Sequence, residues 1–427
     1  MKKHIKKLSI LLASVLAASM ISACSNSGSG DNSGANETKA PVRQDFSGVQ
    51  LEVGAYRDLR TDPYNNSYSI GADKFMEANP GSNVTFTIHK NNEELVTAIA
   101  SNSVWDVQLS IMSPIGSVFN QNIFMPIDEY IDINNPIYTK ELIETACKYN
   151  GKIYGISNVM MSDVLYAIYN ENVYKDYNIK TPHEYYAEGN WSWDGFLSMI
   201  DDLKKNQLNT AIVWEKPFVN RRYGVVWGDD YTASSMFDSQ EQRDWLGFVR
   251  NVVYDKGMTN SKGAVANREV AFRLEILPHI LVSATGMNPV DQMRYIPWIT
   301  KDGKPDDTYV VDYHFCVPNG AKNPEASIAL SNDMIEACID DRTDMYKEGM
   351  TEEDFKIFEE SIKKFYTIAA LNGYYPSEKD MITSFTQGMP VSQYISENKD
   401  RLQQACDDHN KLVEEKKSAN GSAESAK

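Results

Sequence analysis

Aromatic and charged side chains follow several of the apolar runs that the sequence predicts as strands. Flat aromatic faces can stack on the apolar side of a ring-shaped ligand, and carboxylates and arginine exchange hydrogen bonds with its hydroxyl groups. Aromatic residues make up 11% of the chain, with 24 Tyr and 7 Trp, so most of them must lie in the core. We predict ligand contacts only where such side chains lie at strand ends: Tyr56, Asp58, Arg60, Asp106, Trp227, Asp229, Trp298, Asp312, Tyr313, Tyr374 and Tyr375.

No recognisable pattern of catalytic residues accompanies these side chains. The sequence has no H-E-x-x-H, no G-x-S-x-G, no P-loop and no Gly-rich dinucleotide turn. A glycosidase needs only two carboxylates, and among 59 acidic residues some pair is always available, so a secreted glycosidase stays open as the alternative. His314 and Cys316 have ligand spacing, but two positions on one strand supply too few ligands for a metal. We predict a protein without enzyme activity, cofactor or metal.

Length and charge restrict the class of protein further. A chain of 427 residues with 42% hydrophobic residues is too long for one ordinary core and suits two globular lobes. The formal net charge of -17 argues against nucleic acid or anionic lipid as a partner, because both require a basic surface.

The first residues predict export. Four lysines precede an apolar run over residues 8–20, which is shorter than the roughly 20 residues of a membrane span. The small residues that end in Cys24 resemble the lipobox of bacterial lipoproteins, in which the cysteine thiol carries a diacylglycerol. The alternative is an ordinary signal peptide that ends near a cysteine. We expect a signal peptide over residues 1–23 and, over 24–48, a flexible Gly/Ser/Asn-rich tether.

The four other cysteines are far apart in sequence, with no C-x-x-C pair. They could form two disulfides in an exported protein. We expect buried free thiols instead, because the positions fall in predicted helices and a strand rather than in a disulfide framework: Cys147, Cys316, Cys338 and Cys406.

Three apolar runs separated by helical patterns indicate a βαβαβ unit near the start. The strands are predicted at residues 51–55, 84–88 and 105–109. This order favours a parallel sheet covered by helices, with ligands beyond the carboxyl ends of the strands. Asp106 has a structural role as its alternative, because it opens a strand beside Trp105.

Residues 149–170 contain two strand-like runs around a polar break, and we place a junction between two lobes there. A second run, residues 309–317, is long enough to pass from one lobe to the other. Neither lobe is then continuous in sequence. Further strands are predicted at 223–227 and 278–282, and helices at 192–203, 240–256, 323–338, 351–370 and 391–415.

Several short motifs in a fixed order resemble the family 1 extracellular solute-binding proteins of bacterial ABC transporters, lipoproteins that deliver sugars to a membrane permease. Each motif alone is weak, and their order carries the resemblance. Besides the lipobox at Cys24, the motifs lie at residues 125–131, 150–156, 169–174, 191–196, 323–327 and 387–390. Residues 267–272 and 276–279 depart from the family pattern, because a Gly-Lys-x-Ala-Met segment and a binding-site tryptophan are absent there.

The resemblance implies a two-lobed periplasmic-binding-protein-like α/β fold of type II. Each lobe would be a mostly parallel sheet flanked by helices, and crossing strands would let the lobes close on a carbohydrate, which we expect to be an oligosaccharide. The implied hinge residues are Ser157, Asn158, Ser162, Val311 and Phe315.

The same resemblance gives the domain boundaries and the partners. The first lobe is expected at residues 49–157 with 316–340, the second at 158–315 with 341–415, and a disordered tail at 416–427. Carbohydrate, ABC permease subunits and, through the lipid alone, the extracellular face of the cell membrane are the implied partners of a monomer. A surface adhesin or sensor with the same fold stays open as a further alternative.

Overall fold

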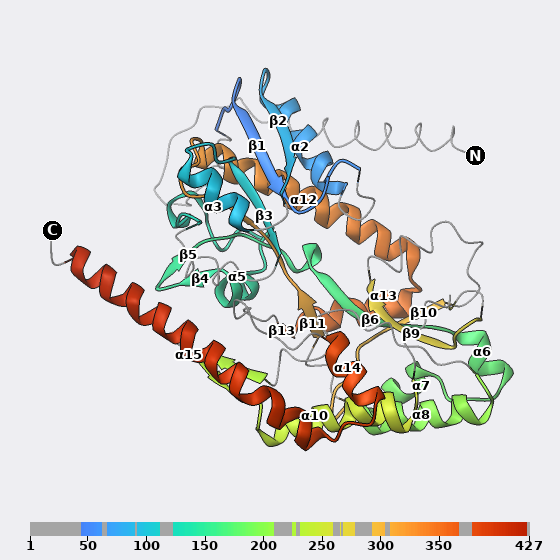
Figure 1. Ribbon diagram of the computed structural model, residues 1–427. Helices are drawn as coiled ribbons and strands as arrows, with labels where there is room; N and C mark the ends of the chain where they lie inside the picture. The colour runs from blue at the N-terminus through green and yellow to red at the C-terminus, as the bar shows by residue number, and fades with distance from the viewer. Residues whose placement is uncertain are drawn as a thin grey trace, which may run out of the picture. The chain divides into compact units, whose positions relative to one another are not determined.

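The computed structural model describes residues 44–61, 66–89, 92–111, 123–208, 224–227, 231–258, 265, 268–277, 293–303, 308–366 and 378–424. The chain divides into Met1–Asp45 and Phe46–Lys427, and every element named below lies in the second unit (Figure 1). The predicted signal peptide, Cys24, the strand at 278–282 and the site residues Asp229, Tyr374 and Tyr375 lie outside the described residues. In the described part, no helix combines the length and the apolar character that a bilayer crossing requires.

The first sheet confirms the βαβαβ prediction. Its strand order is β12-β3-β1-β2, and β1 runs parallel to both of its neighbours. The fourth strand, β12, pairs antiparallel with β3 and comes from far along the chain. The elements are β1 (Gln50–Ala55), α2 (Ser67–Ala78), β2 (Asn83–Ile88), α3 (Asn92–Ala100), β3 (Val107–Ile111) and β12 (Tyr313–Cys316).

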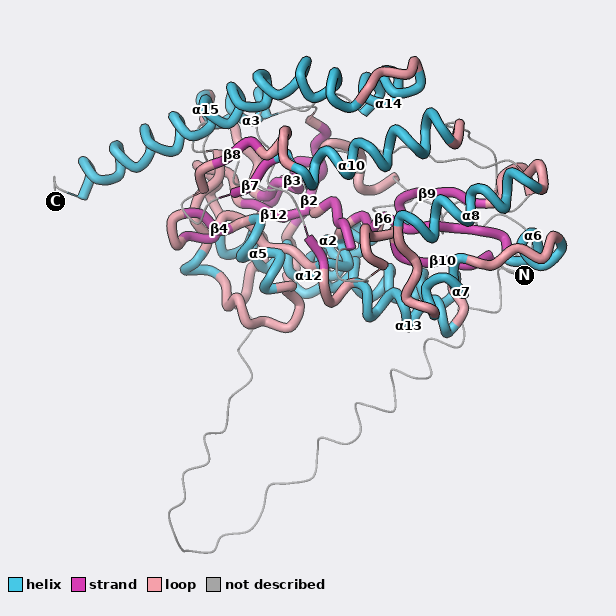
Figure 2. The backbone as a smooth tube through the Cα atoms, turned by 90° about the horizontal axis from the view of Figure 1, so that it is seen from below, coloured by secondary structure: helices cyan, strands magenta, loops and turns pink. Residues whose placement is uncertain are grey.

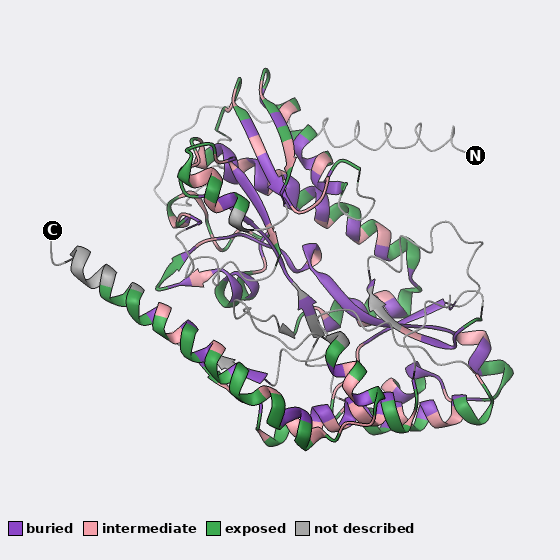
Figure 3. Ribbon diagram, viewed as in Figure 1, coloured by how far each residue is buried: buried purple, intermediate pink, exposed green. Residues whose placement is uncertain are grey.

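The second sheet is built around β6 (Asp163–Asn170), all eight residues of which are buried (Figure 3). Alternate side chains of β6 enter two different cores, with Ala167 and Tyr169 on one face and Tyr166 and Ile168 on the other. Two partner strands, β9 (Phe272–Ile276) and β10 (Met293–Pro297), lie on either side of β6 (Figure 2). The third partner is β11 (Thr308–Val311), with β13 (Phe365–Tyr366) beside it.

Strand direction in this second sheet differs from the prediction. The three strands that pair with β6 all run antiparallel to it, whereas we predicted mostly parallel pairing. For β11 the reason is the path of the chain, because β6 leads into the second sheet and β11 leads back out of it. Only β11 and β13 pair in parallel among the described strands here.

The two segments that connect the sheets lie side by side. Ile156 and Phe315 exchange both backbone hydrogen bonds, each of 2.9 Å, and further along Asp163 pairs with Val311. We call residues 156–164 the first crossing and residues 310–317 the second crossing. The second crossing is one strand-like run, as predicted, but Asp312 interrupts it, so β11 belongs to one sheet and β12 to the other. A short 3-10 helix, η3 (Val159–Met161), interrupts the first crossing.

The remaining elements lie around the two sheets or pack on one another (Figure 1). Helix α12 (Pro324–Gly349) is common to both halves, because Met334 and Ile335 lie in the core of the first sheet and Tyr346 packs with Tyr166 of the second. The others are η2 (Asp128–Tyr130), α5 (Lys140–Ala146), β4 (Lys148–Tyr149), β5 (Lys152–Ile153), α6 (Glu171–Asp176), α7 (Pro182–Ala187), α8 (Trp193–Lys205), β7 (Val225–Trp227), β8 (Ala233–Ser235), α10 (Gln240–Arg250), η4 (Asn251–Asp255), α13 (Glu352–Ser361), α14 (Glu378–Thr386) and α15 (Val391–Glu424).

The end of the chain differs from the prediction of a disordered tail. Helix α15 continues to Glu424, nine residues beyond its predicted end at 415. Extending an existing helix needs no new nucleation, and Lys, Ala and Glu are good helix formers. Val413 is fully buried on this helix and packs in a small apolar cluster with Tyr149 of β4. The four cysteines after Cys24 are buried, as predicted, and are free thiols in the structure.

The start of helix α8 allows a test of whether a single capping residue stabilises the helix. The Ser192 hydroxyl caps this helix, because it accepts a hydrogen bond of 3.2 Å from the Gly195 amide. Changing Ser192→Ala should lower the free energy of unfolding by about 1 kcal/mol, because an amide of the first turn loses its acceptor. Ser198→Ala is the matched control, since the Ser198 hydroxyl is exposed and only donates to the Asp194 carbonyl within the helix. Denaturant unfolding that finds equal effects for both variants would contradict the cap.

Candidate functional site

The carboxyl ends of β1, β2 and β3 meet at one edge of the first sheet, because the three strands are parallel. Large apolar side chains are exposed at this edge. Ile88 at the end of β2 is 56% exposed and Ile111 at the end of β3 is 37% exposed, while Tyr56 directly after β1 is half-buried. An aromatic and aliphatic surface at the carboxyl edge suits the apolar face of a ring-shaped ligand.

Tyr56 is held by two neighbours. Its ring stacks with the ring of Tyr313 on the second crossing, with centroids 6.1 Å apart and planes inclined by 30°. The guanidinium carbon of Arg57 lies 4.5 Å from the Tyr56 centroid, in a cation–π arrangement. The edge of the first sheet is therefore in direct contact with the segment that connects the two sheets.

Tyr313 itself is buried and does not offer its ring to a ligand. Its hydroxyl donates a 2.7 Å hydrogen bond to Asp163 Oδ2, and its backbone carbonyl accepts from the Ser157 hydroxyl. Burial raises the pKa of the Tyr313 hydroxyl well above its ordinary value, and the Asp163 charge raises it further. The hydroxyl thus stays protonated and remains a donor to the first crossing.

Arg342 of α12 fixes the first crossing from the other side. Its buried guanidinium donates to the carbonyl oxygens of Met160 at 3.0 Å and Ser162 at 2.8 Å. Arg342 Nη2 also lies 3.8 Å from Asp163 Oδ1. A buried arginine with several oxygen partners satisfies the groups that η3 leaves without helical partners.

A second polar chain begins at Asp312, where the second crossing changes sheets. The Asp312 carboxylate contacts Nε2 of His314, and Nδ1 of His314 lies 2.9 Å from Sγ of Cys147. All three side chains are buried, and burial raises the pKa of the Cys147 thiol well above its ordinary value. Both ring nitrogens of His314 are engaged in these contacts, which connect the second crossing to the end of α5.

The structure thus brings several predicted residues together at the crossings. Tyr56, Tyr313 and Asp312 lie there, with Tyr56 the one that is accessible at the edge. Of the predicted hinge residues, Asn158 caps η3 by accepting from the Met160 amide at 2.8 Å. The other hinge residues also lie on the two crossings: Ser157, Ser162, Val311 and Phe315.

Three predicted contacts point elsewhere. Asp58 accepts from the Arg60 amide and the Thr61 hydroxyl, both at 2.9 Å, and the Arg60 amide is the main reason that the Asp58 pKa is lowered. The Arg60 guanidinium turns back along β2 and donates to the Val84 carbonyl at 3.3 Å. Asp106 precedes β3, at the opposite end from the carboxyl edge, and accepts from the Glu52 amide at 3.0 Å. Arg60 and Asp106 thus contact strands of the first sheet, and Asp58 holds the loop that follows β1.

Two predicted tryptophans belong to the second half of the chain. Trp227 is the last residue of β7, and its side chain is not described. Trp298 follows β10 and packs against the core, with its ring 5.9 Å from that of Phe196. The structure does not bring Trp298 to the edge formed by Tyr56.

We did not predict a ligand contact at His89, although His89 directly follows β2 as Tyr56 directly follows β1. Its buried ring stacks on Trp105 at 4.7 Å, and Trp105 covers Gly54, where an added Cβ would lie 2.2 Å from the indole nitrogen. Burial lowers the pKa of His89 below its ordinary value. The signal in the sequence is position alone, a polar residue directly after an apolar run of alternating period.

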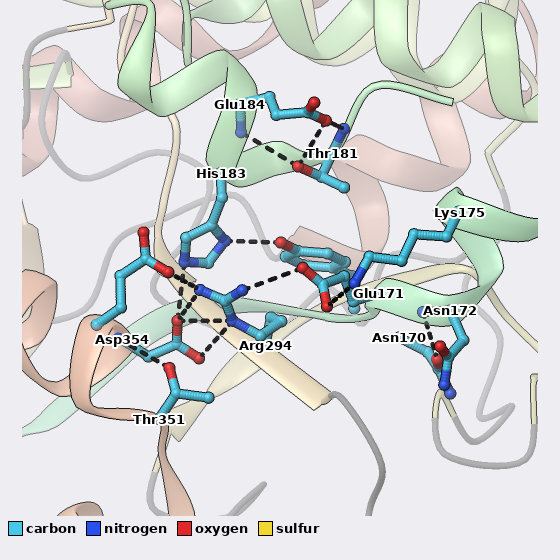
Figure 4. A network of polar contacts seen from close by, with 12 residues as sticks. Asn170, Glu171, Asn172, Lys175, Thr181, His183, Glu184, Arg294, Thr351 and Asp354 are labelled. Carbon is cyan, nitrogen blue, oxygen red and sulfur yellow. Dashed lines mark hydrogen bonds and ion pairs between the residues drawn. The ribbon is translucent and has the colours of Figure 1, made fainter. Parts of the chain in front are cut away.

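A group of charged side chains in the second half, buried except for Glu353, is the other arrangement that could take part in chemistry (Figure 4). His183, Glu353 and Asp354 place one nitrogen and two carboxylates within 4.8 Å of one another, as a metal site would, and no other such group occurs in the described part of the chain. Arg294 Nη2, however, lies 2.5 Å from Glu353 and 2.8 Å from Asp354. The guanidinium already balances the carboxylates, so a cation would meet like charge at short range.

This network joins five elements, α6, α7, α13, β6 and β10. The His183 ring lies between the Tyr169 hydroxyl of β6, 2.7 Å from Nδ1, and Asp354 of α13, 2.8 Å from Nε2. Arg294 of β10 also reaches Glu171 of α6 at 3.2 Å. Burial alone would raise the pKa of Asp354, but the hydrogen bonds and charges of His183 and Arg294 outweigh burial and lower it. The arrangement is suited to holding the fold rather than to contacting a ligand.

The sequence matches the family model for bacterial extracellular solute-binding protein over residues 60–332, more than half of the chain. The chain therefore belongs to the bacterial extracellular solute-binding proteins. No curated protein matches the chain.

Solved structures of binding proteins share the fold. The sugar-binding protein MalE of Xanthomonas citri is 14% identical, with a TM-score of 0.66 over 86% of this chain and 99% of that one. The GacH receptor of Streptomyces glaucescens, solved unliganded and with acarbose, is 15% identical, with a TM-score of 0.63 over 87% and 99%. The substrate-binding protein Lmo0181 of Listeria monocytogenes, in complex with cycloalternan, is 14% identical, with 0.62 over 83% and 98%. At these identities the likeness shows the two-lobed α/β fold of type II, as predicted.

The buried charge network predicts a large and pH-dependent contribution of Asp354 to stability. Asp354→Asn removes the fully buried carboxylate that both Arg294 and His183 contact, while Glu171 and Glu353 remain beside Arg294. The free energy of unfolding at pH 7 should therefore fall by about 3 kcal/mol, the lower end of the cost of breaking a buried ion pair. The Asp354 pKa is lowered in the folded state, so its contribution is present above the ordinary pKa of an aspartate and is lost as the pH falls through the folded value. The difference between the two proteins should therefore shrink towards pH 3 in denaturant titrations.

The matched control is Asp255→Asn. Asp255 pairs with Arg250 at 3.2 Å, but its side chain is 48% exposed, and such surface pairs contribute about 0 to 1 kcal/mol. If Asp354→Asn lowers the free energy of unfolding no more than this control does, Asp354 does not stabilise the fold as proposed. A difference between Asp354→Asn and the unaltered protein that grows as the pH falls would contradict it as well.

Proposed function

We propose that this chain captures a carbohydrate, an oligosaccharide in particular, by closing two lobes around it and delivers it to an ABC import permease. The observation that carries the proposal is the position of Tyr56. A half-exposed aromatic ring stands at the carboxyl edge of a parallel sheet and stacks on a residue of the strand that leads to the other sheet. A sugar ring that stacks on Tyr56 would therefore bind next to the second crossing, which connects the two sheets.

The chemistry of the edge supports a carbohydrate. Sugar rings have one apolar face and hydroxyl groups around their rim, and the edge offers Tyr56 and exposed Ile88 and Ile111 beside the donor Arg57. Proteins of the same fold were solved with cycloalternan and with acarbose. Such a ligand needs positioning and closure, for which the edge and the crossings suffice, so we propose binding without catalysis.

The lobes would close about the two crossings. The core of the first sheet includes residues 51–161 and 313–338, and the cores of the second sheet include the intervening residues and those from 346 onward. This division supports the predicted lobes at 49–157 with 316–340 and at 158–315 with 341–415. A ligand that touches both lobes at once would shift the population towards the closed form.

Thermal unfolding with a panel of saccharides tests the function. A ligand at about 100 times its Kd adds about 2.7 kcal/mol of stability, so a cognate sugar should raise the midpoint measurably. Malto-, manno- and xylo-oligosaccharides of two to four units are the panel, with sorbitol at equal concentration as the control for general solute effects. Stabilisation by none of them beyond sorbitol would exclude these oligosaccharides and direct the search to peptides or other solutes. Release of reducing sugar from any of them would instead support the glycosidase.

We further propose that Cys24 carries a lipid that holds the protein at the extracellular face of the cell membrane. Four lysines, an apolar run and small residues precede Cys24, and a Gly/Ser/Asn-rich segment follows it. Cys24→Ala should move the protein from the membrane fraction to the medium, because no thiol remains for the lipid. Ser27→Ala, three residues further along, should stay with the membrane. Retention of both variants would count against the lipid anchor.

A further inference from the structure

We infer that Tyr313 and Asp163 are positioning residues that transmit contact at Tyr56 to both crossings, and so regulate the closure that the proposed function requires. The inference rests on that proposed function for its biological meaning, although its physical content concerns contacts that exist without any ligand. Three sets of contacts, one after another, connect the edge of the first sheet to α12, which has buried residues in both halves.

The first contact joins the edge to the second crossing. Tyr56 is the half-exposed member of the pair and Tyr313 the buried one, 5% exposed. Their stacked rings, 6.1 Å apart, leave little freedom for one to tilt without the other. A ring seated against Tyr56, or removal of the Tyr56 side chain, therefore acts on Tyr313.

The second set joins the two crossings at both ends of η3. The backbone carbonyl of Tyr313 accepts a hydrogen bond from the hydroxyl of Ser157, which precedes η3. The Tyr313 hydroxyl donates a hydrogen bond of 2.7 Å to Asp163, which follows η3. One residue of the second crossing thus fixes two points of the first crossing. Tyr313 cannot shift without breaking one of these buried hydrogen bonds or moving the first crossing with it.

The third set reaches α12. The second carboxylate oxygen of Asp163 faces Arg342 at 3.8 Å, and Arg342 donates to the carbonyls of Met160 and Ser162. Helix α12 packs in the core of the first sheet through Met334 and with the second sheet through Tyr346. A change at Asp163 therefore reaches a long helix that has buried residues in both halves.

A buried tyrosine whose hydroxyl bonds to neither crossing provides the comparison. Tyr166 of β6 is fully buried, and its hydroxyl lies 2.7 Å from the hydroxyl of Ser361. Its ring contacts Phe358, within the core on one face of the second sheet. Tyr166→Phe thus removes the same atom from a similar setting away from the edge.

The test is a double-mutant cycle read by backbone hydrogen exchange on the full chain without ligand. The reporters are the amides of Ile156 and Phe315, which bond to each other's carbonyl oxygens across the two crossings. Tyr56→Ala should raise their exchange rates several-fold, and this effect should shrink when Tyr313→Phe is already present, because the hydroxyl that transmits it is gone. In the Tyr166→Phe background the effect of Tyr56→Ala should be undiminished.

Asp163 gives an independent approach if Tyr313→Phe folds poorly. Asp163→Asn retains an oxygen that accepts the Tyr313 hydroxyl and should preserve the response to Tyr56→Ala, whereas Asp163→Ala should abolish it. Unchanged exchange at Ile156 and Phe315 in Tyr56→Ala, or additive effects in the cycle, would overturn the inference.

Binding of maltotriose, mannotriose and xylotriose separates this inference from the proposed function. If one of them binds, Tyr313→Phe should weaken its affinity about tenfold, while Tyr166→Phe should leave it unchanged. An equal affinity for all three proteins would overturn the coupling of Tyr313 to the site. If none binds the unaltered chain, the proposed carbohydrate is in error, and the exchange cycle still decides the inference.

Discussion

The antiparallel pairing of the two crossings is the constraint on which the rest of the structure depends. Two strand segments lead from one sheet to the other, and they satisfy each other's backbone groups through Ile156 and Phe315. The chain returns to the second sheet a last time through α12 and α13, which lead to β13. Without this pairing, two buried strands would each carry unpaired amides and carbonyls between the cores. The fold of each half follows from it, because β6 continues from one passage, and β11 and β12 form the other.

Much of this architecture could be predicted from local patterns. Apolar runs located β1, β2 and β6, and a helical pattern from residue 192 located α8, because these signals depend on residues close in sequence. The second crossing was predicted from its length alone. Its interruption at Asp312 was not predicted, because an aspartate between two β-rich runs is equally compatible with a solvent-facing residue in one continuous strand.

The directions of side chains, by contrast, could not be predicted. Arg60 and Asp106 follow or precede strands at the expected places, yet their partners Val84 and Glu52 come from another strand, and only the register of the sheet decides that meeting. Tyr313 was expected to contact a ligand and is instead a buried donor to a residue 150 positions away. The antiparallel direction of the second sheet was missed for the same reason, because pairing between distant strands leaves no local signal.

Two buried arginines show how differently the two regions use charge. Arg294 meets three carboxylates, and such a charge-assisted cluster is costly to disturb, which suits the rigid join between β10, α6 and α13. Arg342 instead bonds mainly to carbonyl oxygens, with its nearest carboxylate at 3.8 Å. Neutral acceptors of this kind can be exchanged for others at a small net cost, roughly 0.5 to 1.5 kcal/mol each. Under the proposed closure, a segment that bends would therefore be better held by Arg342 than by a tight ion pair, because the polar residues of the crossings could keep their partners through a modest rotation of the lobes.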